Sequence, residues 1–302
     1  MLEILDSVIP IYLLILLGVL LKIIKVANDN WIDILNTYAL YIAFPSLIFS
    51  SLTNIPINSE IDYSVFVHNS IILIGIFVFI YVVTKLFIRN KEIKNAYILC
   101  VLFSNAAYLG YPYIISLYPD LGTTISLVIG SYIFVVFTFG LSVLELSKNS
   151  HFKIISIFKN IIINPLLLSV IIGIIFINFK LSLPLPIGNT IKMLSGTASP
   201  VVLVALGIFM VRKIEFNKKL FHAVIITFIK LIIIPAIFIL AAFVVFKKDN
   251  FNVQILEAGM PSAITLFALS QKYPLDKTIT AYVIIISTIA SFISLLILSS
   301  IL

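Results

Sequence analysis

Helix-breaking residues interrupt two of the apolar runs in this chain. Residues 104–112 read Ser-Asn-Ala-Ala-Tyr-Leu-Gly-Tyr-Pro and lie inside an apolar run over 96–117, and residues 258–263 form a similar stretch in the second half. Proline removes a backbone donor and clashes with the preceding helical turn, so each stretch predicts an interrupted helix with unpaired backbone groups. Within a membrane, such groups are tolerated only where they line a cavity or are buried in protein.

The composition indicates a polytopic membrane protein. Of the 302 residues, 61% are hydrophobic and only 11% are charged, and the mean hydropathy is +1.20, whereas soluble domains carry about 25% charged residues. About 20 helical residues span a bilayer. Polar residues divide the chain into ten apolar segments of that order, at 5–25, 32–52, 64–88, 96–118, 122–146, 161–179, 188–210, 220–246, 252–272 and 278–300.

The basic residues predict the orientation of these segments. The net charge is +7, and fifteen of the twenty Lys and Arg residues fall in alternate loops between apolar runs. Such loops stay in the cytoplasm. We therefore expect a protein of the plasma membrane with both termini on the side away from the cytoplasm. Lys247 and Lys248 are exceptions to this pattern. Because the charge lies in loops, we expect no nucleic-acid partner, and no two histidines have metal-ligand spacing, so we expect no metal site.

Two halves of the chain match at an offset of 155 residues. The matched pairs are Pro10 and Pro165, Gly18 and Gly173, Lys25 and Lys180, Pro45 and Pro200, and Tyr118-Pro119 and Tyr273-Pro274. Each half has five segments, an odd number, so the second half enters the membrane from the opposite side. This predicts an inverted repeat with residues 1–147 and 161–302 as its halves and 148–160 as a short cytoplasmic loop. The same offset pairs Asn105 with Met260, so the interrupted fourth and ninth segments should cross.

Four motifs resemble those of the auxin efflux carrier family, within the larger bile-acid/sodium symporter-like and sodium/proton antiporter-like folds. They are residues 41–49, residues 105–112, Ser199-Pro200 with Gly207, and residues 257–263. The resemblance implies a scaffold of segments one, two, six and seven and a transport bundle of the other six. The short central loop is similar to the compact microbial members, which are associated with malonate, malate and other organic anions; plant members export the auxin anion.

The expected substrate site lies at the two interrupted helices. Half-helix N-termini present free N–H groups that suit a carboxylate. Asn105 adds a polar side chain there, either for substrate or as a helix cap, and Tyr108 and Tyr111 add hydroxyls, although Tyr111 fits a packing role equally well. Prolines shape the site. The predicted set is Asn105, Tyr108, Tyr111, Pro112, Pro261, Ser262, Pro45 and Ser199.

Glu257 and Lys230 are ionisable residues inside apolar segments, which marks a functional site by default. Three interpretations stay open. Glu257 takes up the coupling ion, a proton or sodium; or Lys230 forms a buried ion pair with it and replaces a bound cation; or Glu257 is shallow and Lys230 extends to the membrane surface.

These features predict a secondary active transporter of small organic anions, either malonate-like or malate-like dicarboxylates or auxin-like monocarboxylates. A sodium-coupled carrier similar to the bile-acid symporters is the alternative, and a solute or ion channel is an alternative of another class. The chain has neither a His-Glu-x-x-His nor a Gly-x-Ser-x-Gly motif, so we expect no enzyme. The expected partners are the anion, the lipid bilayer and a second copy of the chain in a homodimer.

Overall fold

The computed structural model describes residues 2–53, 62–148, 164–246 and 251–302. Regular structure in these residues is helical, apart from one isolated bridge between Ser104 and Ser262. Seven helical stretches in the same ranges are long and apolar enough to cross a membrane, which confirms a polytopic membrane protein. They are Leu5–Ile23, Asp29–Thr53, Ser64–Phe87, Pro119–Ser147, Leu185–Met210, Lys218–Phe246 and Lys277–Ile301.

The three remaining apolar segments contain shorter helices. The segment predicted at 96–118 is divided into α5 (Lys91–Leu102), the π-helical turn η2 (Ala106–Gly110) and α6 (Tyr111–Leu117). The segment at 252–272 is divided into α15 (Asn252–Ala258) and α16 (Thr265–Lys272). Both predicted interruptions are therefore observed. α10 (Pro165–Asn178) is the third short helix, and the predicted loop at 148–160 lies almost wholly outside the described residues.

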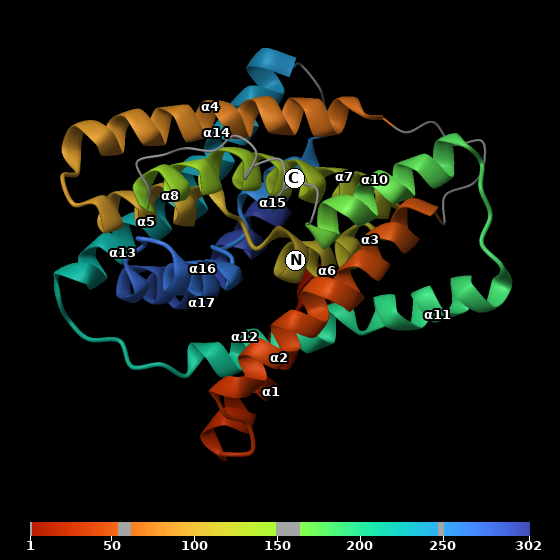
Figure 1. The fold of residues 1–302 in the computed structure, drawn as a ribbon, viewed down its shortest axis with the longest axis horizontal. Coiled ribbons are helices and arrows are strands. Elements are labelled where there is room, and N and C mark those ends of the chain that lie inside the picture. Colours follow the sequence, from red (N-terminus) through yellow and green to blue (C-terminus); the bar gives the residue numbers. More distant parts are fainter. Residues whose placement is uncertain (1, 54–61, 149–163, 247–250) are drawn as a thin grey trace.

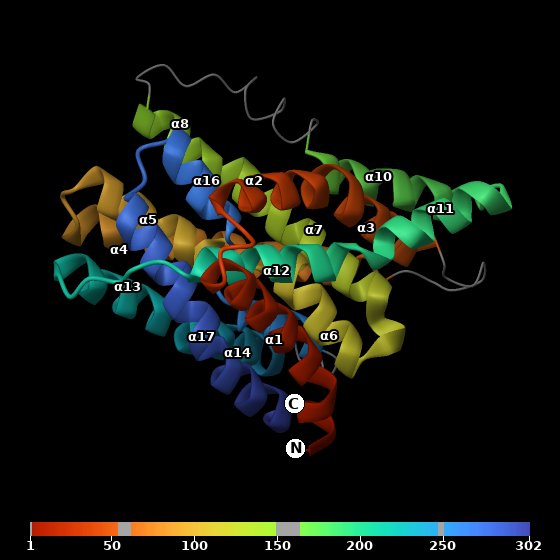
Figure 2. The ribbon, with the colours of Figure 1, turned by 90° about the horizontal axis from the view of Figure 1, so that it is seen from below.

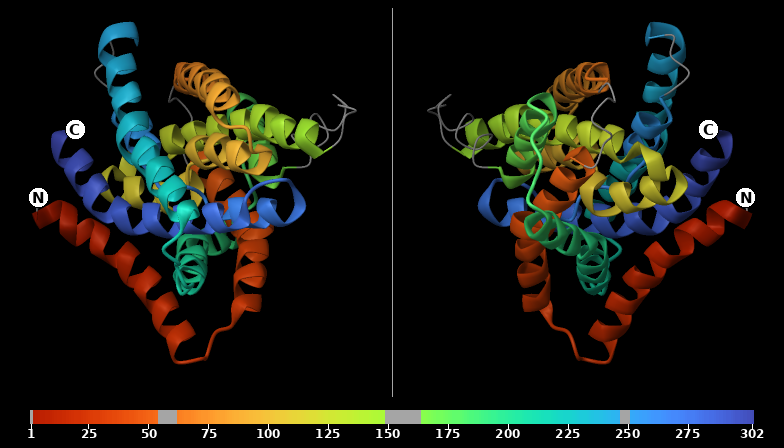
Figure 3. Two further views of the ribbon diagram at one scale, coloured as in Figure 1. Left: turned by 90° about the vertical axis from the view of Figure 1, so that its left-hand side faces the viewer. Right: turned by 90° about the vertical axis from the view of Figure 1, so that its right-hand side faces the viewer.

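The other elements follow in chain order. They are α1 (Leu2–Ile23), α2 (Asp29–Tyr38), η1 (Ala39–Ala43), α3 (Phe44–Thr53), α4 (Ser64–Phe87), η3 (Pro119–Leu121), α7 (Gly122–Val135), η4 (Val136–Gly140), α8 (Leu141–Lys148), α11 (Leu185–Gly196), α12 (Ala198–Met210), α13 (Lys218–Phe228), η5 (Ile229–Ile233), α14 (Ile234–Leu240), η6 (Ala241–Phe246) and α17 (Lys277–Ile301). α4 and α12 lie on opposite sides of the molecule, with α6 and α15 between them (Figures 1 and 3).

Proline accounts for three of the wide π-helical turns. A proline ring clashes with the carbonyl one turn earlier, and a local π adjustment re-satisfies the backbone groups that this frees. The turns η1, η2 and η5 are each followed, two residues later, by Pro45, Pro112 and Pro235, respectively. Two of these turns carry residues of the predicted site, Tyr108 in η2 and Lys230 in η5.

Two tight helix contacts repeat at the offset seen in the sequence. In the contact of α1 with α12, a Cβ on Gly207 would overlap the carbonyl oxygen of Ile15, and one on Gly18 would overlap that of Val204. In the contact of α10 with α3, a Cβ on Gly173 would come within 2.7 Å of Leu52 Cδ1. Gly173 and Gly207 stand 155 residues after Gly18 and Leu52, respectively.

The turns after α1 and α10 are alike as well. The non-glycine residues with positive φ in the described ranges are Lys25 at 61° and Lys180 at 50°, again 155 residues apart. This left-handed conformation is uncommon for residues other than glycine. The two helices therefore end in the same way.

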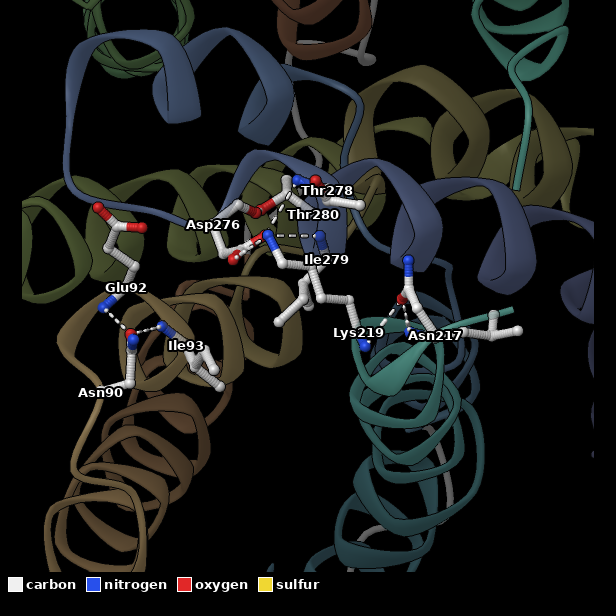
Figure 4. A network of polar contacts seen from close by, with 10 residues as sticks. Asn90, Glu92, Ile93, Asn217, Lys219, Asp276, Thr278, Ile279 and Thr280 are labelled. Atoms are coloured by element: carbon white, nitrogen blue, oxygen red, sulfur yellow. Dashed lines mark hydrogen bonds and ion pairs between the residues drawn. The ribbon is translucent and has the colours of Figure 1, made fainter. Parts of the chain in front are cut away.

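Capping side chains gather where α5, α13 and α17 begin (Figure 4). Asn90 accepts hydrogen bonds from the N–H groups of Glu92 and Ile93, and Asn217 caps α13 in the same manner. Asp276 caps α17 and also forms an ion pair of 2.9 Å with Lys219. Three of the loops rich in basic residues are thereby held together at one end of the molecule.

Candidate functional site

The two interrupted helices pair with each other through their backbones. Ser104 and Ser262 form an antiparallel bridge, in which the N–H of Asn105 donates to Pro261 O at 2.7 Å and the N–H of Ala263 donates to Phe103 O at 3.0 Å. Buried backbone groups need such partners. One backbone N–H of each interruption is therefore bonded to a carbonyl of the other interruption, while the N–H of Ser262 donates to Ser287 Oγ of α17 at 3.2 Å. We call this pairing, over residues 103–105 and 261–263, the crossing.

A serine from each side extends the crossing. The Ser104 hydroxyl donates to the carbonyl oxygen of Glu257 at 2.8 Å, in the last turn of α15, and the Ser262 hydroxyl donates to that of Cys100 at 2.6 Å, in the last turn of α5. Each serine thus caps the C-terminal end of the opposite half-helix. Ser262 belongs to the predicted set, but Ser104 does not, although it directly precedes Asn105.

Polar atoms without partners lie beside the crossing. Asn105 and Tyr108 are only 2% and 4% exposed, and neither Asn105 Nδ2 nor the Tyr108 hydroxyl has a hydrogen-bond partner in the described structure. The Asn105 side chain does not cap the following turn; its backbone carbonyl instead accepts from Leu109 and Gly110, each at 3.0 Å. Buried polar groups are nearly always hydrogen-bonded, so these donors suit a ligand that accepts hydrogen bonds.

The other members of the predicted set lie at contacts between neighbouring helices. The Tyr108 ring stacks on Phe44 of α3, with ring centroids 4.8 Å apart, so Phe44 rather than its neighbour Pro45 supplies this contact. The Tyr111 hydroxyl is hydrogen-bonded to Ser51 of α3 at 2.5 Å. Pro112 stands in the first turn of α6 and Pro261 lies in the crossing, whereas Ser199 lies on α12, a helix that packs on η2.

Lys230 reaches the crossing from α13 and η5. Its side chain is 0% exposed, and Nζ donates to Ser104 Oγ at 3.0 Å and to the carbonyl oxygen of Ala258 at 3.3 Å. Nζ also lies 5.9 Å from the centre of the Tyr132 ring, within the range of a cation–π contact. Lys230 is therefore not a side chain that extends to the membrane surface.

Glu257 is equally buried within the protein, at 0% exposure. Neither carboxylate oxygen has a hydrogen-bond partner in the described structure. The carboxylate fills the space left by Gly110, since a Cβ there would overlap it. The ion pairs of the described residues do not include Lys230 with Glu257. Sequence reasoning identified both charges but missed Gly110, Tyr132 and Ser104 around them.

Together, an all-helical membrane fold, two interrupted helices that cross, and buried charged groups beside them define a membrane transporter. The chain matches the family described as membrane transport protein over residues 3–299, and it belongs to that family. This confirms the resemblance to the auxin efflux carriers. It is a transporter and not an enzyme.

Curated relatives cover nearly the whole chain. An uncharacterized transporter of Methanothermobacter thermautotrophicus is 26% identical, with 96% of this chain and 95% of the relative covered. An uncharacterized transporter of Methanocaldococcus jannaschii is 28% identical, with 94% of each covered. A protein of Rhizobium meliloti whose name proposes malonate transport is 25% identical, with 96% of this chain and 93% of the relative covered.

Proposed function

We propose that this protein is a secondary active carrier of small organic anions and that the anion binds beside the crossing. The observation that carries the proposal is the pair of buried, unpartnered donors, Asn105 Nδ2 and the Tyr108 hydroxyl. A carboxylate accepts hydrogen bonds from such groups without needing a full cation. The neighbouring stack of Tyr108 on Phe44 would give the bound anion an apolar wall.

The proposed architecture is ten membrane crossings arranged as two inverted five-helix repeats, 1–147 and 161–302. It is supported by contacts and turns that recur at the 155-residue offset, namely Gly18 with Gly173, Leu52 with Gly207, and Lys25 with Lys180. In this architecture α1 to α3 and α10 to α12 form the scaffold. The remaining helices form the bundle that moves, and their interrupted members carry the site.

The substrate class follows from the chemistry of the site. We propose a small mono- or dicarboxylate, with malonate and malate as the first candidates and auxin-like monocarboxylates after them. The name of the Rhizobium meliloti relative supports malonate. A proton or sodium ion taken up by Glu257 would couple transport to a gradient, because that carboxylate is buried and has no hydrogen-bond partner.

The proposed orientation places both termini outside the cytoplasm in the plasma membrane. Both ends of the chain lie together at one end of the molecule (Figure 2), as an even number of crossings requires. Three of the basic loops are joined to each other by the capping network around Asp276. Lys22 and Arg212, from two of the basic loops, both pair with Asp29. We also propose that two copies of the chain associate as a homodimer.

Uptake into proteoliposomes tests the proposed function. Labelled malonate, malate and a monocarboxylate would be offered with and without proton and sodium gradients, and we expect saturable uptake that exchanges with internal substrate. Asn105→Ala should weaken binding about tenfold or more, the loss of one hydrogen bond to a charged group. Asn189→Ala, on the exposed face of α11, is the matched control.

The outcomes separate the alternatives. Absence of specific flux for every carboxylate under all gradients would overturn the carrier proposal. Flux that neither saturates nor exchanges with internal substrate would indicate a channel. Undiminished binding by Asn105→Ala would move the site away from the crossing.

A further inference from the structure

We infer that Arg212 is a gating residue of this carrier: its guanidinium, stacked between Phe209 of the scaffold and Phe267 of the moving bundle, closes the route to the crossing from the side of the basic loops. The inference rests on the proposed function, because it concerns the movement that exposes the same site. It assigns Arg212 a role in access to the site rather than in binding the anion.

The guanidinium of Arg212 lies between two aromatic rings. Its central carbon is 4.5 Å from the centre of the Phe209 ring and 4.4 Å from that of the Phe267 ring. The two rings meet edge to face, with their centres 5.0 Å apart. A guanidinium is planar and weakly hydrated, so it stacks on aromatic faces better than an ammonium does. Because Phe209 ends α12 and Phe267 begins α16, this stack of three side chains joins the scaffold to the bundle.

The stack lies between the crossing and the protein surface. α16 begins at Thr265, directly after the crossing, and α12 packs on η2 of the first interruption. Phe209 is 0% exposed, whereas the Arg212 side chain is 31% exposed. The stack therefore extends from the buried interior outward, and an anion that enters between α12 and α16 has to pass it.

The partners of Arg212 differ in which proposed domain they belong to. Its Nη2 atom lies 3.9 Å from Asp29 Oδ1, and that carboxylate also pairs with Lys22 at 2.9 Å. Lys22 in α1, Asp29 in α2 and Phe209 in α12 all belong to the proposed scaffold. Movement of the bundle would therefore leave Arg212 with these partners and separate it from Phe267 alone. A gate requires a contact of this kind, which forms and breaks while its other partners stay in place.

The repeat places a different contact on the opposite route. The 155-residue offset carries α3 to 199–208, inside α12, and α6 to 266–272, inside α16. Ser51 of α3 is hydrogen-bonded through its hydroxyl to that of Tyr111 in α6 at 2.5 Å, and Thr123 Oγ1 donates to Ser51 O at 3.2 Å. Equivalent contacts of an inverted repeat face opposite sides of the membrane. One route is therefore closed by hydroxyl groups and the other by a cation between aromatic rings.

Labelling of a cysteine placed behind the stack tests the inference on the purified full chain in detergent. Ala205 is 0% exposed and stands one turn before Phe209 on the same face of α12. A bulky, water-soluble maleimide should label Ala205→Cys slowly in a Cys100→Ala background. Adding Arg212→Ala should raise the rate about fivefold or more, the effect of one lost cation–π contact. Lys213→Ala, at the exposed neighbouring position, is the matched control and should leave the rate unchanged.

Two further variants separate opening of the gate from unfolding. The native Cys100 is 0% exposed in α5, so it should stay unlabelled when Arg212→Ala is made in the natural chain. Phe267→Leu keeps an apolar side chain but removes one ring of the stack. It should expose the cysteine at position 205 as Arg212→Ala does.

Three results would overturn the inference. The first is an unchanged rate at position 205 in both Arg212→Ala and Phe267→Leu, and the second is an equal gain at position 205 and at Cys100. The third is the same gain after Ser51→Ala, which breaks only the contact on the opposite route. None of these readings needs a transported anion, so a failure of the gate is distinguishable from a failure of the flux experiment.

Discussion

Lys219 and Lys230 stand on the same helical stretch, eleven residues apart, in opposite surroundings. Lys219 is half-exposed and pairs with the Asp276 carboxylate at 2.9 Å. Lys230 is fully buried, and its hydrogen-bond acceptors are a hydroxyl and a backbone carbonyl. The Glu257 carboxylate, which the sequence offered as a partner, does not form an ion pair with Lys230 in the described structure.

The difference separates two uses of charge. Lys219 is half-exposed and in contact with water, so its pair with the buried Asp276 carboxylate contributes about 1 kcal/mol at most, and the Lys219 network stabilises mainly through the helix caps that it shares. A buried charge is costly to desolvate, and a fold that retains one has another reason for it. At Lys230 that reason is the joining of two broken helices, which an apolar side chain cannot do.

The largest effect is expected from Glu257→Gln. This change removes the carboxylate charge that partly compensates the buried Lys230 ammonium and puts an amide without hydrogen-bond partners in its place. We expect a loss of about 3 kcal/mol of stability, about half of it from the lost interaction with Lys230. Thermal unfolding in detergent measures it, with Glu215→Gln on the exposed linker after α12 as control. A variant as stable as wild type would mean that Glu257 is already uncharged in the folded protein.

The next effect is expected from Gly110→Ala, because the new Cβ would overlap the Glu257 carboxylate. Overpacking of this kind costs about 2 kcal/mol. Gly188→Ala is the control, since that position faces open space. The cost should shrink in a Gly110→Ala/Glu257→Ala double variant, and a cost that stays the same would show that the carboxylate does not occupy this space.

A double-mutant cycle measures how strongly the two buried charges depend on each other. Lys230→Met and Glu257→Gln should each destabilise the protein, while the combined variant should be more stable than the sum predicts by about 1.5 kcal/mol. Unfolding temperatures of the four proteins provide the values. Strict additivity would mean that the two charges do not interact.

The smallest effects belong to the pair of half-exposed Lys219 and Asp276. Asp276→Ala should cost about 1 kcal/mol, because it removes the cap of α17, and Lys219→Ala should cost about 0.5 kcal/mol or less. High salt should reduce the loss for Lys219→Ala further, since it screens exposed charges. A larger loss for Lys219→Ala than for Asp276→Ala would contradict the dominance of the cap.

The sequence predicted the elements that depend on local chemistry. Proline and glycine placement located both interruptions, and the 155-residue offset predicted that they meet. The roles of individual side chains depend on tertiary packing and were harder to predict. The hydroxyl of Ser104 caps a helix 153 residues away, and no local pattern signals such a contact. The 155-residue offset matches Ser104 with Gly259, which has no side chain, so the repeat did not mark Ser104 either.

The predicted ion pair illustrates the same limit. Sequence position identified Lys230 and Glu257 as charges inside apolar segments, with an ion pair between them as one of three interpretations. In the described structure Lys230 donates to Ser104 and Ala258, whereas the Glu257 carboxylate has no hydrogen-bond partner. The wide turn η5 and the missing side chain at Gly110 set these directions. The stack of Phe44 on the Tyr108 ring is a smaller case, because the sequence analysis singled out Pro45 of this turn but not Phe44.

The backbone pairing at the crossing has a mechanical consequence. The Asn105 N–H and the Ala263 N–H are each bonded to the opposite stretch, so neither interrupted helix can shift without breaking hydrogen bonds or pulling the other along. Any displacement is thus transmitted through a single joint. An anion bound beside that joint would move together with both interrupted helices. The protein would not pass through a state in which only one half of its site has moved.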